Sequence, residues 1–299
     1  MLVVKQERKR VLLCNVRVYE MKEDKENEIK EESYRQETPE AQYETFEEAA
    51  KRQIRQAQKR KAIRAGIILC CLLIAGAVFY YYKRNVEPNQ KYDLALAVIQ
   101  DAEIGDIIVL GTYDQDSVDG KDDVQWLVLD KRDSKYLLTT QYCLWGLPYN
   151  TDYTDVTWET STIRKWLNEE FIYEVFNNQE MALIAETEIT TKGNDEYSTQ
   201  GGNDTLDKLF LLSAEEVEQY FDSEDDRVLH PTWYAERYGI NVNSNYSSSW
   251  WWLRTPGNLQ DAVATVDPKG TISMFGHDVS STTGGLRPAL WIDISKVSD

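Results

Sequence analysis

The sequence predicts an α+β domain that follows a single membrane-spanning helix. Residues 65–82 carry no charge over eighteen positions, which is the length of a short membrane span. Three segments rich in β-branched and aromatic residues follow, at 105–113, 124–130 and 135–142, and they favour strands. Residues 160–176 then place apolar side chains at helical spacing. Short strands mixed with a few helices indicate an α+β architecture with small antiparallel sheets.

The apolar segment Ala65–Tyr82 has basic residues at both ends. As a helix it rises by about 27 Å, which is near the lower limit for a hydrocarbon core, and its last three tyrosines suit the headgroup region. Seven Lys and Arg residues lie within residues 51–64, against three soon after the segment. Because positive residues stay inside, we expect a cytoplasmic N-terminus and an extracytoplasmic domain beyond the span, the type II orientation in the cell membrane.

A buried helix of a soluble domain and a cleaved signal peptide are the alternatives to a membrane anchor. The signal peptide fits poorly, because the apolar run begins at residue 65 and ends in tyrosines rather than in a small-residue cleavage site. The buried helix fits poorly, because no charge interrupts the run while basic residues crowd its first end. The segment is therefore predicted to be a retained anchor, with membrane lipid as its partner.

The composition divides the chain into five parts. Translation is hypothesised to start at Met21 rather than Met1, because the first twenty residues resemble nothing that follows them. The expected parts are a disordered charged cytosolic segment at 1–38, a basic juxtamembrane helix at 39–64, the transmembrane helix at 65–82, a linker with a short helix at 83–103, and one extracytoplasmic domain at 104–299.

Charge and cysteine content exclude some classes of function. Residues 1–64 carry 16 Lys and Arg against 13 Asp and Glu, whereas the rest of the chain carries 17 against 38. Nucleic acid is therefore an unsuitable partner for the outer domain, because phosphates need a cationic surface. That domain has a single cysteine, Cys143, so it forms no internal disulfide. Cys143 is expected to be a small buried apolar residue rather than a reactive thiol.

An acidic loop lies between the first two predicted strands. Ca²⁺ prefers several carboxylate oxygens on a short loop, which makes Asp114, Asp116 and Asp119 candidate ligands. The spacing of an EF-hand is absent, because Asp119 stands at the sixth position, where glycine is required. A solvated hairpin loop is the preferred alternative, so the sequence predicts no metal and no cofactor.

Two features of the middle of the chain indicate helices. Residues 160–176 form an amphipathic stripe that includes Trp166, which is expected to pack on the sheet. Ser213 and Glu216 have the spacing of a capping box, in which each side chain bonds the main chain of the other, so a helix should run from there to residue 221. Residues 232–238 form another short helix, which Gly239 ends.

The most informative tract begins with three consecutive tryptophans, Trp250, Trp251 and Trp252. Alternation in a strand sends Trp251 to the face opposite its neighbours, so at least one indole is expected to be buried, and a core role is favoured for these residues. An exposed indole beside a polar loop can also stack on a sugar ring. The three tryptophans, with Asn245 and Tyr246 of the preceding loop, are therefore the candidate ligand-binding residues.

Several segments together carry a resemblance to a known family. GDIIVLGTY, VQWLVLD, TWETSTIRKWLNEEF, DKLFLLSAEE, WWLRTPG and GGLRPALWI occur in this order, and residues 104–294 resemble the bacterial DUF6273 family, a domain of unknown function. The closing GGLRPAL is also similar to the last strand of the sulfatase-modifying-factor and C-type-lectin-like folds. That second resemblance implies a compact α+β domain with long loops and a small twisted sheet.

Two arginines of this tract are predicted to be structural. Arg254 and Arg287 stand beside prolines in tight turns, where a guanidinium can satisfy buried carbonyl or carboxylate oxygens. Asp207 and Glu159 are the possible carboxylate partners, and the sequence does not decide between them. Ligand contact is the alternative role of both arginines.

No catalytic template is present. The chain has no GxSxG elbow, HExxH helix or phosphate-binding loop, and only two histidines. Catalytic residues are therefore predicted to be absent, and the leading hypothesis is an extracytoplasmic binding module for a glycan or a surface protein. The contacts are expected from the loops at 193–204 and 241–252. A carboxylate-dependent hydrolase of cell-wall polysaccharide and a sensor that signals to the cytosolic segment are the alternatives.

Overall fold

The structure, a computed structural model, describes residues 46–296 and divides the chain into two compact units, Met1–Phe79 and Tyr80–Asp299. The predictions for the charged N-terminal segment, for the start of the basic helix and for the choice between Met1 and Met21 lie outside the described residues.

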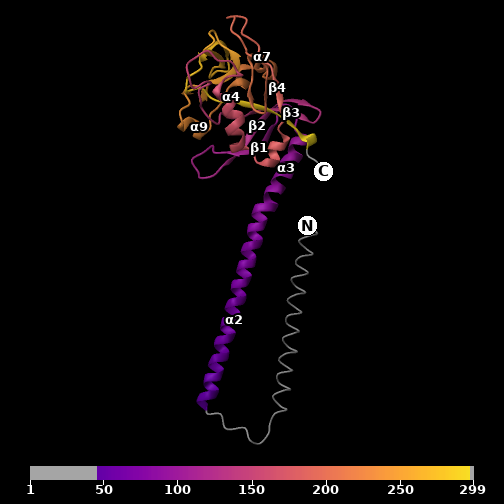
Figure 1. Cartoon of the computed structure of the whole chain (residues 1–299), viewed down its shortest axis with the longest axis vertical. Coiled ribbons are helices and arrows are strands. Elements are labelled where there is room, and N and C mark those ends of the chain that lie inside the picture. Colours follow the sequence, from indigo (N-terminus) through magenta and orange to yellow (C-terminus); the bar gives the residue numbers. More distant parts are fainter. Residues whose placement is uncertain (1–45, 297–299) are drawn as a thin grey trace. The chain divides into compact units, whose positions relative to one another are not determined.

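A long helix carries the basic and the apolar segments together. Helix α2 (Phe46–Tyr81) runs without interruption through both, so the juxtamembrane helix and the predicted span are one element (Figure 1). Within the described residues, one stretch, Ile54–Val86, is long and apolar enough to cross a membrane, and none of its most apolar window is buried. The π-helical turn η1 (Tyr82–Val86) follows α2.

The second unit, Tyr80–Asp299, called the outer unit for its predicted location, is built on a five-stranded antiparallel sheet. Its strands are β1 (Ile107–Tyr113), β2 (Asp122–Arg132), β3 (Lys135–Thr140), β12 (Pro288–Asp293) and β6 (Phe210–Leu211), in this spatial order. The three-stranded meander β1-β2-β3 is the one that the sequence predicted. Strand β12 lies between β3 and β6 and pairs with both, so a strand far along the sequence from β3 is inserted inside the sheet.

Helix α3 (Glu87–Asp101) belongs to the folded unit rather than to a linker. Ile99 is fully buried and Ala102, the residue after the helix, is 4% exposed, and both belong to the core of the sheet. The segment at 83–103 was predicted as a linker with a short helix, and the structure differs because an apolar side of α3 packs against β1.

A glycine shapes the first strand. The pairing of β1 with β2 shifts register between Val109 and Thr112, and Gly111 lies in this bulge with φ of 75°. A Cβ atom at Gly111 would come within 2.6 Å of Val175, so a larger residue would push away the helix that covers the strand. The bulge therefore requires glycine for both its dihedral angle and its lack of a side chain.

The amphipathic segment at 160–176 is helical, with a π-helical turn in its middle. It consists of α4 (Thr162–Trp166), η2 (Leu167–Phe171) and α5 (Ile172–Val175). In η2 the Asn168 side chain donates to the main-chain oxygen of Arg164 at 3.0 Å. This bond competes with the main-chain N–H groups that would donate to the same oxygen in a regular α-helix. Trp166 is half-buried and packs on Phe171, with 4.8 Å between ring centroids.

The rest of the unit consists of short helices and small sheets. A second sheet has the order β11-β10-β9, and two-stranded sheets join β4 with β5 and β7 with β8, all antiparallel. An α+β fold with small antiparallel sheets is therefore confirmed. The elements are α6 (Asn178–Leu183), β4 (Thr187–Ile189), β5 (Thr205–Asp207), α7 (Ala214–Tyr220), α8 (Glu224–Arg227), α9 (Trp233–Arg237), β7 (Val242–Asn243), β8 (Ser248–Ser249), β9 (Trp251–Pro256), β10 (Ala262–Val266), β11 (Ile272–Asp278) and η3 (Ile294–Lys296).

Candidate functional site

A cleft of about 380 Å³ opens beside the start of α7. Most of its lining residues have polar or charged side chains, and they come from three parts of the chain: the loop after β4, the first turn of α7 with its cap, and the strands β9 and β11. The lining residues are Thr190, Lys192, Gly193, Asn194, Asp195, Glu196, Ser213, Ala214, Glu215, Glu216, Arg254, Thr255 and Met274.

An ion pair between Arg254 and Glu216 forms one wall of this cleft. The Arg254 guanidinium donates to both carboxylate oxygens of Glu216, from Nη1 to Oε2 and from Nη2 to Oε1, the latter at 2.9 Å. Nη1 also donates to the Leu211 main-chain oxygen at 2.8 Å. The Arg254 side chain is 5% exposed and that of Glu216 is 26% exposed. A buried cation therefore has a half-buried anion as its partner.

Glu216 has a second role in the cap of α7. The Ser213 amide donates to Glu216 Oε2 at 2.9 Å, and the Glu216 amide donates to Ser213 Oγ at 3.1 Å, so the predicted capping box is confirmed. The same carboxylate thus holds the first turn of the helix and the guanidinium of Arg254. The sequence did not indicate the second contact, because Arg254 is 38 residues away.

One nitrogen of Arg254 has no partner. Arg254 Nε is buried and makes no hydrogen bond within the described residues, although both Nη atoms are bonded. An unpaired buried N–H is costly to the fold. At the rim, Lys192 and Glu215 form an ion pair at 2.8 Å, with both side chains about two-thirds exposed or more.

The predicted ligand loop at 193–204 borders this cleft and is tightly held. Asn194 Nδ2 donates to the main-chain oxygens of Pro256 at 2.9 Å and of Met274 at 3.1 Å, while its Oδ1 accepts from the Glu196 amide. Asn194 is 1% exposed. The buried side-chain amide of Asn194 therefore fixes the loop to the second sheet. In the sequence, the many glycines of this loop were the feature that indicated such close packing.

Arg287 lies away from the cleft and has no carboxylate partner in the described contacts. Its Nε donates to the Thr140 main-chain oxygen at 3.2 Å and its Nη1 to that of Arg227 at 3.3 Å. The guanidinium stands over the rings of Phe221 and Trp251, at 4.6 and 5.3 Å from their centroids. Burial lowers its pKa to about 9, which leaves it charged at pH 7. Its role is structural, as predicted.

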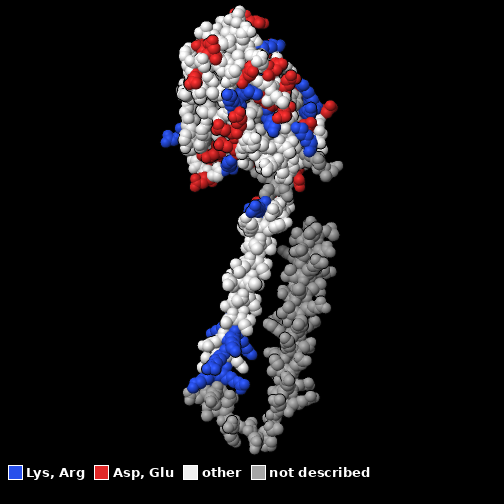
Figure 2. Space-filling model, viewed as in Figure 1, with Lys and Arg blue, Asp and Glu red and all other residues white. Residues whose placement is uncertain are grey.

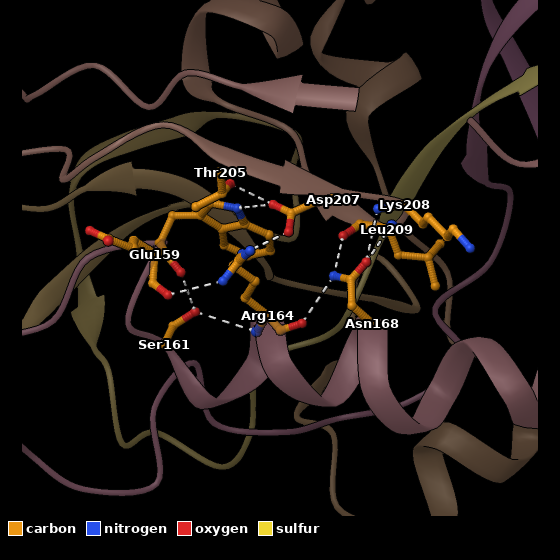
Figure 3. A network of polar contacts seen from close by, with 9 residues as sticks. Glu159, Ser161, Arg164, Asn168, Thr205, Asp207, Lys208 and Leu209 are labelled. Atoms are coloured by element: carbon orange, nitrogen blue, oxygen red, sulfur yellow. Dashed lines mark hydrogen bonds and ion pairs between the residues drawn. The ribbon is translucent and has the colours of Figure 1, made fainter. Parts of the chain in front are cut away.

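The two carboxylates considered as partners of these arginines are bound elsewhere. Asp207 Oδ1 accepts from Arg164 Nε at 2.7 Å, and its Oδ2 accepts from Trp158 Nε1 at 2.8 Å and from Thr205 Oγ1 at 2.6 Å (Figure 3). The Glu159 carboxylate accepts from Asn203 at 3.0 to 3.2 Å. The expectation that either acid pairs with Arg254 or Arg287 is wrong.

Asn168 extends the network of Asp207. Its Oδ1 accepts from the Lys208 and Leu209 amides at 2.9 and 3.0 Å, and its Nδ2 donates to the Leu209 main-chain oxygen at 2.8 Å (Figure 3). Arg164 and Asn168 come from one helical segment, so the network joins that segment to the turn after β5. Every polar group of Asp207 and Asn168 is used inside the fold, which indicates a structural role.

The three consecutive tryptophans are all buried. Trp250 is 7% exposed, and Trp251 and Trp252 are 0% exposed. The ring of the exposed His277 stacks on Trp250 at 4.2 Å, and the main-chain oxygen of Leu147 accepts from Trp252 Nε1 at 2.9 Å. All three indoles are buried, in line with the favoured core role, so none of them is exposed for stacking on a sugar ring.

The other candidate residues lie outside the cleft. Asn245 and Tyr246 are exposed in the turn between β7 and β8, and residues 241–252 contribute nothing to the cleft lining. The structure therefore does not bring the two predicted ligand loops together at this cleft. Cys143 is fully buried, and burial raises the pKa of its thiol to about 12, as expected for an unreactive side chain.

The acidic loop after β1 is a turn held by its own side chains. Asp116 Oδ1 accepts from the Val118 amide at 2.6 Å, and Asp122 Oδ2 accepts from the Gln115 amide at 3.2 Å. Over residues 46–296, no group of three or more His, Cys, Asp or Glu is arranged to hold a metal ion. The alternative interpretation of Asp114, Asp116 and Asp119 as calcium ligands gains no support.

The outer unit is thus an α+β domain with a polar cleft and buried arginines. The family model described as a domain of unknown function (DUF6273) matches residues 133–294, which is more than half of the chain. The chain therefore belongs to the DUF6273 family, as the order of its segments predicted. No curated protein and no solved structure matches the chain at a significant level.

Proposed function

We propose that this protein is a single-pass membrane-anchored binding module that presents its DUF6273 domain outside the cell. The observation that carries the proposal is the stretch Ile54–Val86, whose most apolar window is not buried at all. Leu72 and Leu73 are 65% and 66% exposed. Such a helix is costly in water, because each exposed apolar side chain forgoes about 1.5–3 kcal/mol of burial, whereas a bilayer accommodates all of them.

The charge distribution along α2 supports the orientation. Arg55, Lys59, Arg60 and Lys61 are exposed on the turns where the stretch begins, and Figure 2 shows basic side chains at one end of this helix followed by uncharged ones. Beyond the span, Lys83 is already paired with Glu87 at 2.7 Å. The positive-inside rule then places the N-terminus in the cytoplasm and the domain outside.

The cleft beside α7 is the proposed ligand-contact surface. It offers the exposed Lys192 ammonium as a donor and several carboxylates as acceptors, which suits a hydroxylated ligand such as a glycan, or a polar segment of a surface protein. Binding is favoured over hydrolysis, because Glu216, the carboxylate of the cleft that is not exposed, is held by Arg254 and by the cap of α7 rather than free to act as a general acid or base. A C-type-lectin-like fold for the domain is likewise proposed rather than shown. A sensor that signals to the cytosolic segment remains the alternative function.

Protease protection tests the placement of the domain. The full chain, with an epitope at each end, is expressed in cells that are converted to spheroplasts and treated with protease from outside. The C-terminal epitope should be lost and the N-terminal one kept. Loss of the N-terminal epitope alone would overturn the orientation, and protection of both would overturn membrane crossing. A variant with Arg55, Lys59, Arg60 and Lys61 changed to Gln should give mixed protection, because the charge bias is reduced.

A second experiment tests binding against hydrolysis. The full chain in lipid nanodiscs is titrated with soluble fragments of cell-wall glycan, and tryptophan fluorescence and product formation are recorded together. A saturable fluorescence change without cleavage supports the binding module. Cleavage of the fragments would establish the hydrolase instead, and the loss of that activity in Glu215→Gln or Glu216→Gln would identify the acid.

A further inference from the structure

A cluster of aromatic rings lies outside the residues that line the cleft, where α9 meets the segment after β3. The ring centroids of Trp145 and Tyr234 are 5.0 Å apart, those of Tyr234 and Tyr238 are 4.3 Å apart, and those of Trp145 and Tyr238 are 6.1 Å apart. The Trp145 and Tyr238 planes are nearly parallel, at 11°. Tyr238 is 60% exposed, and Trp145 and Tyr234 are half-buried, so the cluster reaches the surface.

The inner side of the cluster is fixed by the core. Tyr113, which is 6% exposed, meets Trp145 edge-on at 6.2 Å and Phe171 at 5.2 Å. The Tyr234 amide donates to the main-chain oxygen of Gln115 at 3.2 Å, which ties α9 to the end of β1. The rings are therefore held in place before any ligand arrives, so a ligand would bind with little ordering cost.

Negative charge lies beside these rings. Asp114 Oδ1 is buried and has no hydrogen-bond partner within the described residues. Asp114 and Glu174 both contribute to raising the pKa of Tyr113 and Tyr234, after the larger effect of burial. Lys121 approaches this region, but it donates to the main-chain oxygen of Glu174 rather than to a carboxylate. Two carboxylates, one of them with a buried oxygen that lacks a partner, therefore lie near the rings, and Lys121 and Arg237 of α9 are the neighbouring cations.

The surface view agrees with this charge distribution. On the face drawn in Figure 2, Asp and Glu side chains gather in the area between the positions that Figure 1 labels α9 and β1. An uncharged ligand such as a sugar gains nothing from nearby carboxylates, whereas a cation gains from them and from the electron-rich faces of the rings.

We propose that the ring cluster of Trp145, Tyr234 and Tyr238, backed by Asp114 and Glu174, is a binding site for an organic cation. The cation is a soft ammonium or guanidinium group, which loses little hydration when it rests on aromatic faces. A free quaternary ammonium compound and a basic side chain of another protein share this chemistry. The site is separate from the cleft, so the proposal does not depend on a ligand there.

The test is a titration of the full chain in nanodiscs whose lipids contain no choline. Choline, its uncharged analogue 3,3-dimethylbutanol and N-acetylarginine amide are added at constant ionic strength, and tryptophan fluorescence is followed. Saturable binding of choline or of the arginine derivative is expected, with the neutral analogue at least about tenfold weaker, since one cation–π contact of a desolvated group accounts for about that factor. Tighter binding of choline would indicate a free quaternary ammonium compound as the ligand, and tighter binding of the arginine derivative would indicate a basic side chain of another protein.

Three variants connect the binding to the ring cluster. Tyr238→Ala and Asp114→Asn should each weaken cation binding by about fivefold to tenfold. Trp233→Ala is the matched control, because Trp233 lies on the same helix and is 49% exposed but is not one of the clustered rings. The thermal midpoint of each variant confirms that it is folded. Equal binding of choline and its neutral analogue, an equal loss in Trp233→Ala, or no saturable binding of either cation would overturn the proposal.

Discussion

Two carboxylate–guanidinium pairs of the outer unit have opposite patterns of burial. In the pair of Asp207 and Arg164 the acid is buried, with 1% of its side chain exposed against 23% for the base. In the pair of Glu216 and Arg254 the base is buried, with 5% exposed against 26% for the acid. The first pair is closed, since both oxygens of Asp207 are fully bonded, while the second forms the wall of a cleft and leaves Arg254 Nε unpaired.

This difference separates a contact that holds the fold from one that is available to a ligand. Removing one member of a buried pair is costly because the other charge is left in a low-dielectric interior. The cost falls when the remaining partner can reach water. A substitution in the closed pair should therefore lower the stability of the fold, whereas a substitution in the open pair should change both stability and ligand binding.

The largest effect is expected for Asp207→Asn. The amide cannot accept from Arg164, Trp158 and Thr205 together, and it turns an N–H toward one of these donors. The free energy of unfolding should fall by about 3 kcal/mol, at the lower end for a buried pair because Arg164 is partly exposed. Denaturant unfolding of the full chain in micelles measures the loss. Glu188→Gln is the control, since Glu188 is exposed on the adjacent strand β4 and should change stability very little.

A smaller loss is expected for Glu216→Gln. The glutamine still caps α7 through one oxygen but leaves the Arg254 charge without its anion. Stability should fall by about 2 kcal/mol, because the site is open to water through the cleft. Glycan-fragment binding, measured by fluorescence, should change as well. If stability fell as much as in Asp207→Asn while binding stayed the same, the distinction between a closed and an open pair would not hold.

The smallest effect is expected for Glu215→Gln at the rim of the cleft. Lys192 and Glu215 are 71% and 67% exposed, and exposed ion pairs contribute less than about 1 kcal/mol. The thermal midpoint should therefore stay within a degree or two of the unchanged protein, whether measured at low or at high salt. A loss comparable to that of Glu216→Gln would mean that the rim is more rigid than its exposure indicates.

Local sequence patterns were sufficient to predict several structural features of this molecule. The meander β1-β2-β3 follows from three β-rich segments separated by turn residues, and the cap of α7 follows from the spacing of Ser213 and Glu216. The long apolar helix follows from composition alone. These features depend on residues close together in the sequence, which is why the sequence indicates them.

The partners of the buried charges could not be predicted in the same way. Arg254 and Glu216 are 38 residues apart, and Asp207 meets Arg164 across 43 residues. Which acid reaches which base depends on how α4 packs beside β5 and how α7 packs beside β9, and composition carries no information on that packing. The ring cluster of α9 was missed for the same reason, since Trp145 and Tyr238 are distant in the sequence and meet only after folding.

The position of β12 has a consequence for biosynthesis. This strand is among the last described residues, yet it fills the gap between β3 and β6. Until residues 288–293 have left the ribosomal exit tunnel, β3 and β6 each have an unpaired edge and the sheet is in two parts. The domain therefore cannot complete its fold before this strand is available. Truncation of the chain before residue 288 would leave two exposed strand edges, on β3 and β6, and the product should aggregate or be degraded rather than persist as a shortened, folded form.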